Sequence, residues 1–345
     1  MEDKLVLFNQ TTLKKLLNKR QAETKFGEHV KMITDISNIY EQLKSLDVEY
    51  VIIGLPEDVG VFANYGKSGT STAWEATIKI LLNIQSNKFT QAKKVLILGH
   101  LDFCSKLKKL SSLSQKNAKD VAKARKIVSK IDKEVSNLIY NVISAGKKPI
   151  IIGGGHNNAY GNLKGTSLAL NKRLNVINFD AHSDFRNEEG RHSGNGFSYA
   201  FSEGFLRNYF IFGLHENYTS DIIFKALDNN KNIAYNTFED IEIKKELNYK
   251  SAMENALNHV SKDSFGIEID CDAIQNIQSS AMTPSGFSVN QAREFVHFFG
   301  NQENATYLHI CEAAPTPKNE AQVGKLITYL ITDFIKANAS KNSIV

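Results

Sequence analysis

The sequence alternates between short apolar runs and longer segments with helical periodicity, and this alternation limits the folds that the chain can adopt. The apolar runs are rich in β-branched and aromatic residues, and most are apolar throughout rather than at every second position. Strands of this kind are buried on both faces, as in a parallel sheet that helices cover. The runs span residues 49–55, 94–99, 148–153, 174–179, 208–213, 232–236, 265–270 and 306–311.

Segments with helical periodicity separate several of these runs, most clearly at residues 118–146 and 319–337. Strands that alternate with helices predict a three-layer α/β/α fold with a mainly parallel sheet of about eight strands. The composition is that of a globular protein, since 42% of the 345 residues are hydrophobic, and no linker rich in Pro, Gly or Ser divides the chain. We therefore expect a single domain over residues 1–345, with 1–46 as an N-terminal helical extension and 338–345 as a flexible tail.

Charge and composition argue against several classes of partner. The net charge of +5 comes from 42 basic and 37 acidic residues, and no nucleic-acid-binding motif accompanies the basic runs. The sequence also lacks a signal peptide and the run of about 20 apolar residues that a membrane helix needs. The three cysteines lack metal or redox spacing and are expected to be buried free thiols. We expect a cytoplasmic protein that binds a small molecule rather than nucleic acid or a membrane.

Four of the apolar runs end in clusters of polar residues. The clusters are "IIIGGGHNN" (150–158), "INFDAHSDFR" (177–186), "IEIDCDAI" (267–274) and "HICEAAP" (309–315). Ligands of open parallel sheets bind beyond the carboxyl ends of the strands, so these clusters should meet at one rim of the sheet.

The residue types in these clusters are those of a metal centre. Asp180 and His182 alternate after a strand and can face one spot, with Asp184 reaching over from the turn, while Asp270 and Asp272 have the same spacing. Each motif alone also fits a solvated loop or a helix cap, but carboxylates at the ends of buried strands are costly unless a cation is present. Four carboxylates and two imidazoles favour manganese or a similar hard ion, and this number of carboxylates suits two bridged cations. The predicted ligands are His156, Asp180, His182, Asp184, Asp270 and Asp272.

These motifs resemble, in order and spacing, the signatures of the superfamily that contains arginase, agmatinase and formimidoylglutamase. They are "NYGKSGTSTAWEATIK" (64–79), "GGGH" (153–156), "DAHSD" (180–184), "IDCD" (269–272) and "EAAP" (312–315). The resemblance covers about residues 50–335. It implies a pair of Mn²⁺ ions, a bridging hydroxide that attacks an amidine or guanidine carbon, and a homo-oligomer of three or six chains.

The resemblance also implies a role for each ligand. His156 and Asp184 would bind one cation, and His182 and Asp272 the other, with Asp180 and Asp270 bridging the two. Asp184 would also help to move the proton of the hydroxide, and Glu312 would grip the cationic C–N group of the substrate. The third signature departs from the usual Ser-x-Asp-x-Asp because Glu268 occupies the serine position. A register that uses Glu268 and Asp270 is therefore an alternative to the favoured pair, Asp270 and Asp272.

Within the superfamily, the sequence is most similar to the formimidoylglutamases. "GGGHNN", Arg186 after "DAHSD" and "SGNGF" (193–197) resemble their motifs. A guanidinium can grip a carboxylate with two parallel hydrogen bonds, so Arg186 is expected to bind an acidic substrate, although a salt bridge to Glu188 or Glu189 would also explain it. The expected substrate contacts are Arg186, Asn157, Ser193, Asn195 and Glu312.

The expected reaction is hydrolysis of N-formimidoyl-L-glutamate to L-glutamate and formamide, as in histidine degradation. The main alternative is an arginase or agmatinase activity that releases urea, with His192 as a catalytic proton shuttle. A metal-stabilised binding subunit without catalysis is the alternative from another class. His215 also follows a strand and has either a pocket role or a structural one.

Overall fold

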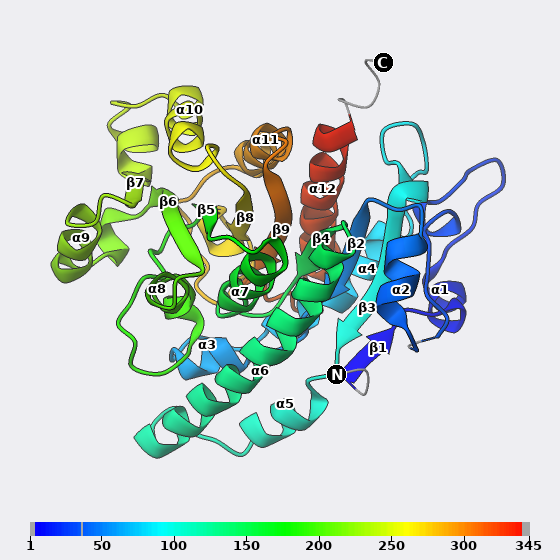
Figure 1. Cartoon of the computed structure of the whole chain (residues 1–345), viewed down its shortest axis with the longest axis horizontal. Coiled ribbons are helices and arrows are strands. Elements are labelled where there is room, and N and C mark those ends of the chain that lie inside the picture. The colour runs from blue at the N-terminus through cyan, green and yellow to red at the C-terminus, as the bar shows by residue number, and fades with distance from the viewer. Residues whose placement is uncertain (1–3, 36, 340–345) are drawn as a thin grey trace.

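The computed structural model describes residues 4–35 and 37–339. Within these residues, nine strands form one sheet with the spatial order β1-β3-β2-β4-β9-β8-β5-β6-β7 (Figure 1). β1 is antiparallel to β3, and all other neighbouring strands are parallel. The strands are β1 (Leu5–Leu7), β2 (Tyr50–Gly54), β3 (Val95–Leu101), β4 (Lys148–Ile152), β5 (Leu174–Phe179), β6 (Leu206–Leu214), β7 (Ile233–Thr237), β8 (Phe265–Asp270) and β9 (Ala305–Cys311).

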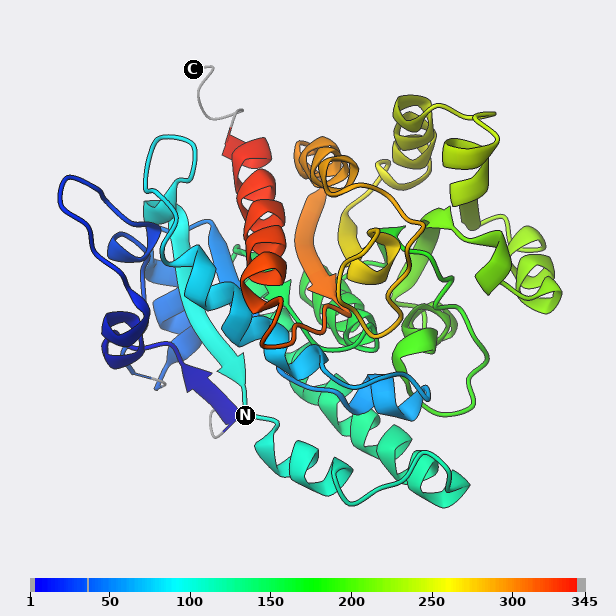
Figure 2. The same cartoon turned by 180° about the vertical axis from the view of Figure 1, so that it is seen from behind.

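Helices cover both faces of the sheet, which confirms the predicted three-layer α/β/α fold. One buried apolar cluster joins the sheet to α1, α4, α10, α11 and α12, and a second joins its other face to α2, α3 and α5–α9 (Figures 1 and 2). The helices are α1 (Gln10–Leu16), α2 (Ile39–Ser45), α3 (Val59–Ala63), α4 (Ala73–Leu81), α5 (Cys104–Leu110), α6 (Ala118–Ser144), α7 (Asn158–Leu170), α8 (Gly196–Ser202), α9 (Asp221–Asp228), α10 (Tyr249–Val260), α11 (Val289–Gly300) and α12 (Glu320–Ala339).

The longest of these helices, α6, shows how the sequence specifies a covering helix. Its N-terminus is capped by Asn117, whose side chain accepts a hydrogen bond of 2.9 Å from the backbone N–H of Lys119. Apolar residues then recur every three or four positions and form one buried stripe. The stripe contains Val121, Ala124, Val128, Ile131, Val135, Leu138, Ile139 and Val142.

All eight expected strands are present, but β1 was not predicted. The segment 1–46, expected as a helical extension, contains the helices α1 and α2 together with this edge strand. β1 is too short to show a periodicity, and it depends on a tertiary feature, the glycine at position 99 of its partner strand. Gly99 has a φ of +127°, and a Cβ there would lie 2.0 Å from the carbonyl oxygen of Val6.

Three other expectations concern the termini, the membrane and the cysteines. Of the tail expected at 338–345, the first two residues still belong to α12, and residues 340–345 lie outside the described part. None of the described helices has the length and apolar character needed to cross a membrane. Cys271 and Cys311 are buried free thiols as expected, but Cys104 is exposed because it begins the short helix α5 at the surface.

The four strands that end in polar clusters are neighbours in the sheet. They are β4, β9, β8 and β5, which are consecutive in the spatial order and run parallel. Their carboxyl ends therefore lie side by side at one edge of the sheet, toward which the orange strand β9 points downward in Figure 2. The fold brings the four motifs together although about 160 residues of sequence separate the first from the last.

Candidate metal centre and substrate pocket

The glycine-rich loop after β4 is held in place by a buried carboxylate. Glu57 accepts hydrogen bonds from the backbone N–H of Gly155, at 3.0 Å, and from the side-chain amide of Asn158, at 2.8 Å. Gly154 has a φ of +71°, and a Cβ there would lie 2.3 Å from that amide nitrogen. The loop therefore needs glycine for its conformation and for the close approach, and it delivers His156 to the edge of the sheet.

His156 faces three carboxylates. Its Nδ1 lies 2.8 Å from an oxygen of Asp184 and 3.2 Å from an oxygen of each of Asp180 and Asp270. His156 is fully buried, and its Nδ1 makes no hydrogen bond of acceptable geometry with any described residue. Without a cation, burial and the charges of Asp272 and Asp180 raise the pKa of Asp270 well above its usual value. One ring nitrogen among three repelling carboxylates is the arrangement expected around a bound cation.

A second group of ligand atoms lies beside the first. The Nδ1 of His182 is 3.1 Å from an oxygen of Asp272 and 3.7 Å from Oδ1 of Asp180. The other oxygen of Asp180, Oδ2, faces His156, so this carboxylate belongs to both groups. The structure thus brings together all six predicted ligands, with Asp180 in the position of a bridge, whereas Asp270 is grouped with His156. Two adjacent groups rich in carboxylate oxygen suit a pair of hard divalent cations such as Mn²⁺.

The geometry favours one of the two registers considered for the third motif. Asp270 and Asp272 each belong to a ligand group, and the backbone N–H of Asp272 donates to Oδ1 of Asp270 at 2.8 Å. Glu268 lies deeper, on β8, where its carboxylate is 3.5 Å from Nε2 of His156. This places Glu268 behind a ligand rather than among the ligands.

Two of the acidic residues at the site have a strained backbone. Asp184 has a φ of +45° and Glu312 has a φ of +58°, in the left-handed region that side chains other than glycine rarely adopt. Each residue follows shortly after the end of a strand. The left-handed backbone turns the chain there and directs the carboxylate into the site. Such strain persists where the surrounding structure enforces it, typically at functional positions.

A pocket of about 580 Å³ opens over the metal ligands. His182, Asp184, Asp270 and Asp272 form part of its wall. The remaining wall includes Asn64, Gly66, Arg186, Glu189, Ser193, Tyr218, Ile222, Ser280 and Glu312. The cation sites and a space for an organic substrate are therefore contiguous.

Glu312 is fixed in this pocket by the motif that contains His156 and by Ser280. Its carboxylate accepts a hydrogen bond of 2.8 Å from the backbone N–H of His156 and another from the hydroxyl of Ser280. Burial raises its pKa to about 8. A carboxylate desolvated to this degree is stabilised when a cationic group binds beside it.

Arg186 lines the same pocket. Its guanidinium donates to the side-chain oxygen of Asn64 at 2.6 Å and lies 3.5 Å from a carboxylate oxygen of Glu189. The amide of Asn64 also donates to the hydroxyl of Ser193 at 3.1 Å. Both interpretations of Arg186 thus have structural support, because this half-exposed residue contacts Glu189 and also faces the pocket. Asn64 was not predicted, although it begins the first of the motifs.

Two of the expected substrate contacts have structural roles instead. Asn157 is fully buried and packs against Gly60, where a Cβ would lie 1.7 Å from the amide oxygen of Asn157. The side-chain oxygen of Asn195 accepts from Arg191, and its amide donates to the carbonyl of Gly190. Both side chains are therefore directed into the protein and not into the pocket.

The two histidines of uncertain role are also structural. His192 is buried, its Nδ1 accepts from the backbone N–H of Gly194 at 3.1 Å, and burial lowers its pKa to about 3. A proton shuttle needs a pKa near the working pH and access to the substrate, so this geometry contradicts a catalytic role for His192. The ring of His215 is stacked between Tyr218 and Phe238, at centroid distances of 5.1 and 4.6 Å.

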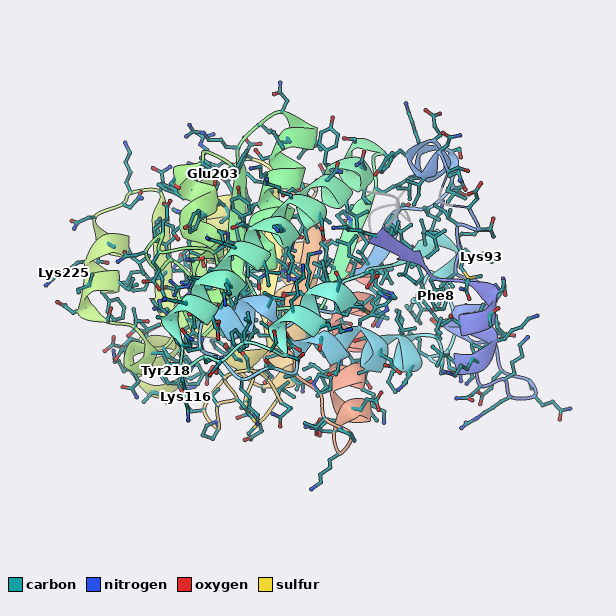
Figure 3. The ribbon with its side chains drawn as sticks, turned by 90° about the horizontal axis from the view of Figure 1, so that it is seen from below. Phe8, Lys93, Lys116, Glu203, Tyr218 and Lys225 are labelled. Atoms are coloured by element: carbon teal, nitrogen blue, oxygen red, sulfur yellow. The ribbon has the colours of Figure 1, made fainter. Side chains whose placement is uncertain are left out.

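The segment after β6 forms part of the pocket wall, and this contribution was not predicted from the sequence. The ring of Tyr218 stacks on His182 at a centroid distance of 5.3 Å, and Tyr218 lines the pocket. Figure 3 labels Tyr218 together with Lys225, which belongs to α9 in the same segment. No motif marks this loop, and its proximity to the metal ligands arises only from the tertiary fold.

Comparison with known proteins agrees with these observations. Residues 48–336 match the model of a family described as "Arginase family". A formimidoylglutamase from Streptococcus gordonii is 28% identical over 270 residues, which cover 74% of this chain and 76% of the relative. Among solved structures, formimidoylglutamase from Bacillus subtilis has a TM-score of 0.74 and 19% identity, with 95% of each chain covered. A formiminoglutamase from Trypanosoma cruzi, whose structure contains Mn²⁺, has a TM-score of 0.69 and 19% identity, with 87% of this chain and 98% of that chain covered. Because the family model matches most of its length, the chain belongs to the arginase family.

Proposed function

We propose that the chain is a manganese-dependent hydrolase that converts N-formimidoyl-L-glutamate and water to L-glutamate and formamide. One observation carries the proposal: the same pocket contains a carboxylate-rich metal centre, a buried carboxylate at Glu312 and a guanidinium at Arg186. The substrate has complementary groups, a cationic amidine at one end and carboxylates at the other. The names of relatives such as the S. gordonii enzyme support the same substrate.

In the proposed mechanism, the metal ligands, Glu312, Asp184 and Arg186 each have a separate role. The six carboxylate and imidazole side chains would hold the Mn²⁺ pair, and the chemistry that this pair would supply is activation of water for attack on the amidine carbon. Glu312 binds and orients the amidine nitrogens, because its carboxylate is already aligned by His156 and Ser280. Asp184 faces both the pocket and the ligand group, so its carboxylate is placed to accept a proton and pass it to the leaving nitrogen. Arg186 binds a remote carboxylate of the substrate.

A turnover screen tests the proposal. The manganese-loaded protein is incubated with formimidoylglutamate, arginine, agmatine and guanidinobutyrate, and formamide and urea are quantified. Formamide and glutamate from formimidoylglutamate are expected, with an Asp180→Ala variant as the inactive control. Release of urea from a guanidino compound would identify the alternative activity, against which the buried, neutral His192 already argues. Absence of turnover on all four compounds would favour a noncatalytic binding subunit.

Two further properties accompany this function. We propose that the protein acts in the cytoplasm and that it assembles into a trimer or hexamer, as its resemblance to the superfamily implies. Light scattering coupled to size-exclusion chromatography measures the assembly, and fractionation of cells measures the location.

A further inference from the structure

A buried polar network lies beside the second ring nitrogen of His156. The carboxylate of Glu268 lies 3.5 Å from Nε2 of His156 and 2.5 Å from Nδ1 of His309. Its other oxygen accepts a hydrogen bond of 2.7 Å from the hydroxyl of Tyr307. All four residues are fully buried, and Glu268 is outside the two ligand groups of the metal centre.

The two central strands of the sheet build this network. Glu268 on β8 is directly opposite His309 on β9 in the parallel register. Side chains two residues apart share a face, so Glu268 lies on the same face as the ligand Asp270 and one step below it. Gly266 makes room for the ring of Tyr307, since a Cβ there would lie 2.2 Å from the ring. Gly266 thus leaves space for the tyrosine whose hydroxyl donates to Glu268 beneath the ligand groups.

The position of the Glu268 carboxylate matters for which of the two ring nitrogens of His156 carries the proton. A histidine binds a cation through an unprotonated nitrogen, and Nδ1 is the nitrogen that faces the ligand carboxylates. The ring proton then belongs on Nε2, which lies 3.5 Å from a carboxylate oxygen of Glu268 and makes no hydrogen bond of acceptable geometry with any described residue. A carboxylate behind a metal-binding histidine fixes its tautomer and orientation and makes it a stronger ligand.

We propose that Glu268 is a positioning residue for the manganese centre. Its carboxylate is clamped by Tyr307 and His309 and keeps the ring of His156 turned so that Nδ1 faces the cation site. The inference rests on the manganese centre proposed above, but not on the identity of the substrate.

Binding of Mn²⁺ to the full chain, measured by calorimetry after chelation and by electron paramagnetic resonance, tests this role. Glu268→Gln keeps the shape and loses the charge, and we expect the Kd of one of the two Mn²⁺ ions to rise about tenfold. Glu268→Ala removes the contact altogether and should raise that Kd about a hundredfold. The other ion, assigned to His182 and Asp272, should change less.

A control variant separates positioning from general stability. Asn175 is a buried polar residue of β5 whose amide donates to the carbonyl of Val260 at 2.7 Å, away from the metal ligands. Asn175→Ala should lower Tm but leave both Mn²⁺ affinities unchanged. The proposal is overturned if Glu268→Gln binds both ions with wild-type affinity, and this near-isosteric variant decides the matter if Glu268→Ala does not fold. Failure of the proposed function gives a different result, wild-type protein that binds manganese but leaves formimidoylglutamate intact.

Discussion

Replacement of Arg186 by alanine tests how the pocket recognises an acidic substrate. The guanidinium is half exposed and is oriented by Asn64, with Glu189 at 3.5 Å. An exposed ion pair of this kind contributes about 0–1 kcal/mol to stability, so Arg186→Ala should barely change Tm. A charge-assisted contact to a substrate carboxylate contributes about 1.5–3 kcal/mol, which corresponds to a decrease of about 10- to 150-fold in kcat/KM.

The change should appear mainly in KM, because the contact is to a part of the substrate that does not react. Steady-state kinetics with formimidoylglutamate measure it, and manganese content confirms that the metal centre is intact. Arg186→Lys should recover only part of the loss, since an ammonium cannot make two parallel hydrogen bonds. Glu189→Gln keeps the guanidinium and removes its salt-bridge partner, and its KM serves as the comparison; its Tm does not, because Glu189 also pairs with Arg125 at 2.9 Å. An unchanged KM in Arg186→Ala, together with a loss of Tm, would mean that Arg186 is a structural residue.

Three further predictions concern a bridging ligand, the loop that carries His156 and the pH dependence of stability. Asp180→Ala should lose bound manganese and hydrolysis together, because Asp180 belongs to both ligand groups, and full metal occupancy by elemental analysis would contradict the assignment. Gly60→Ala places a methyl group 1.7 Å from the amide oxygen of Asn157, so it should displace the loop that carries His156, cost about 1–3 kcal/mol in urea unfolding and weaken Mn²⁺ binding. The depressed pKa of His192, about 3, means that the unfolded chain binds the extra proton below pH 6.5, so stability is lost as the pH falls from that value. Between pH 7 and pH 5 the wild type should lose about 2 kcal/mol more than His192→Asn, which keeps a hydrogen-bond acceptor but does not titrate, and equal losses in urea unfolding would refute the argument.

The sequence predicted best those features that depend on local pattern. The eight buried strands, and the six side chains that the structure gathers into two groups, could be predicted because apolar runs and the alternation after a strand are properties of a few consecutive residues. The favoured pair at the third motif, Asp270 and Asp272, agrees with the ligand groups for the same reason. The edge strand β1 escaped prediction because it has only three residues and is defined by its partner, Gly99 included.

The substrate contacts were harder to predict because proximity to a motif does not determine where a side chain points. Asn157 directly follows a metal ligand, yet it is directed toward Gly60, and Asn195 is occupied by Arg191. Tyr218 and Ser280 come from loops without a recognisable pattern. Their positions follow from packing between distant segments, as in the stack of Tyr218 on His182.

The strand order of the sheet has a consequence for how the protein can be made. β9, the last strand in the chain, lies in the middle of the sheet, between β4 and β8. Until residues 305–311 are in place, the sheet consists of two unconnected halves, with His156 at the edge of one and the acidic ligands of β5 and β8 on the other. During synthesis the nascent chain thus cannot complete the ligand group that contains His156 before its final strand has left the ribosome, because the other members of that group lie at or just after the ends of β5 and β8. Occupancy of both cation positions therefore reports on completion of the fold, and a chain that is cut short before Ala305 should have neither a continuous sheet nor the ligand group of His156.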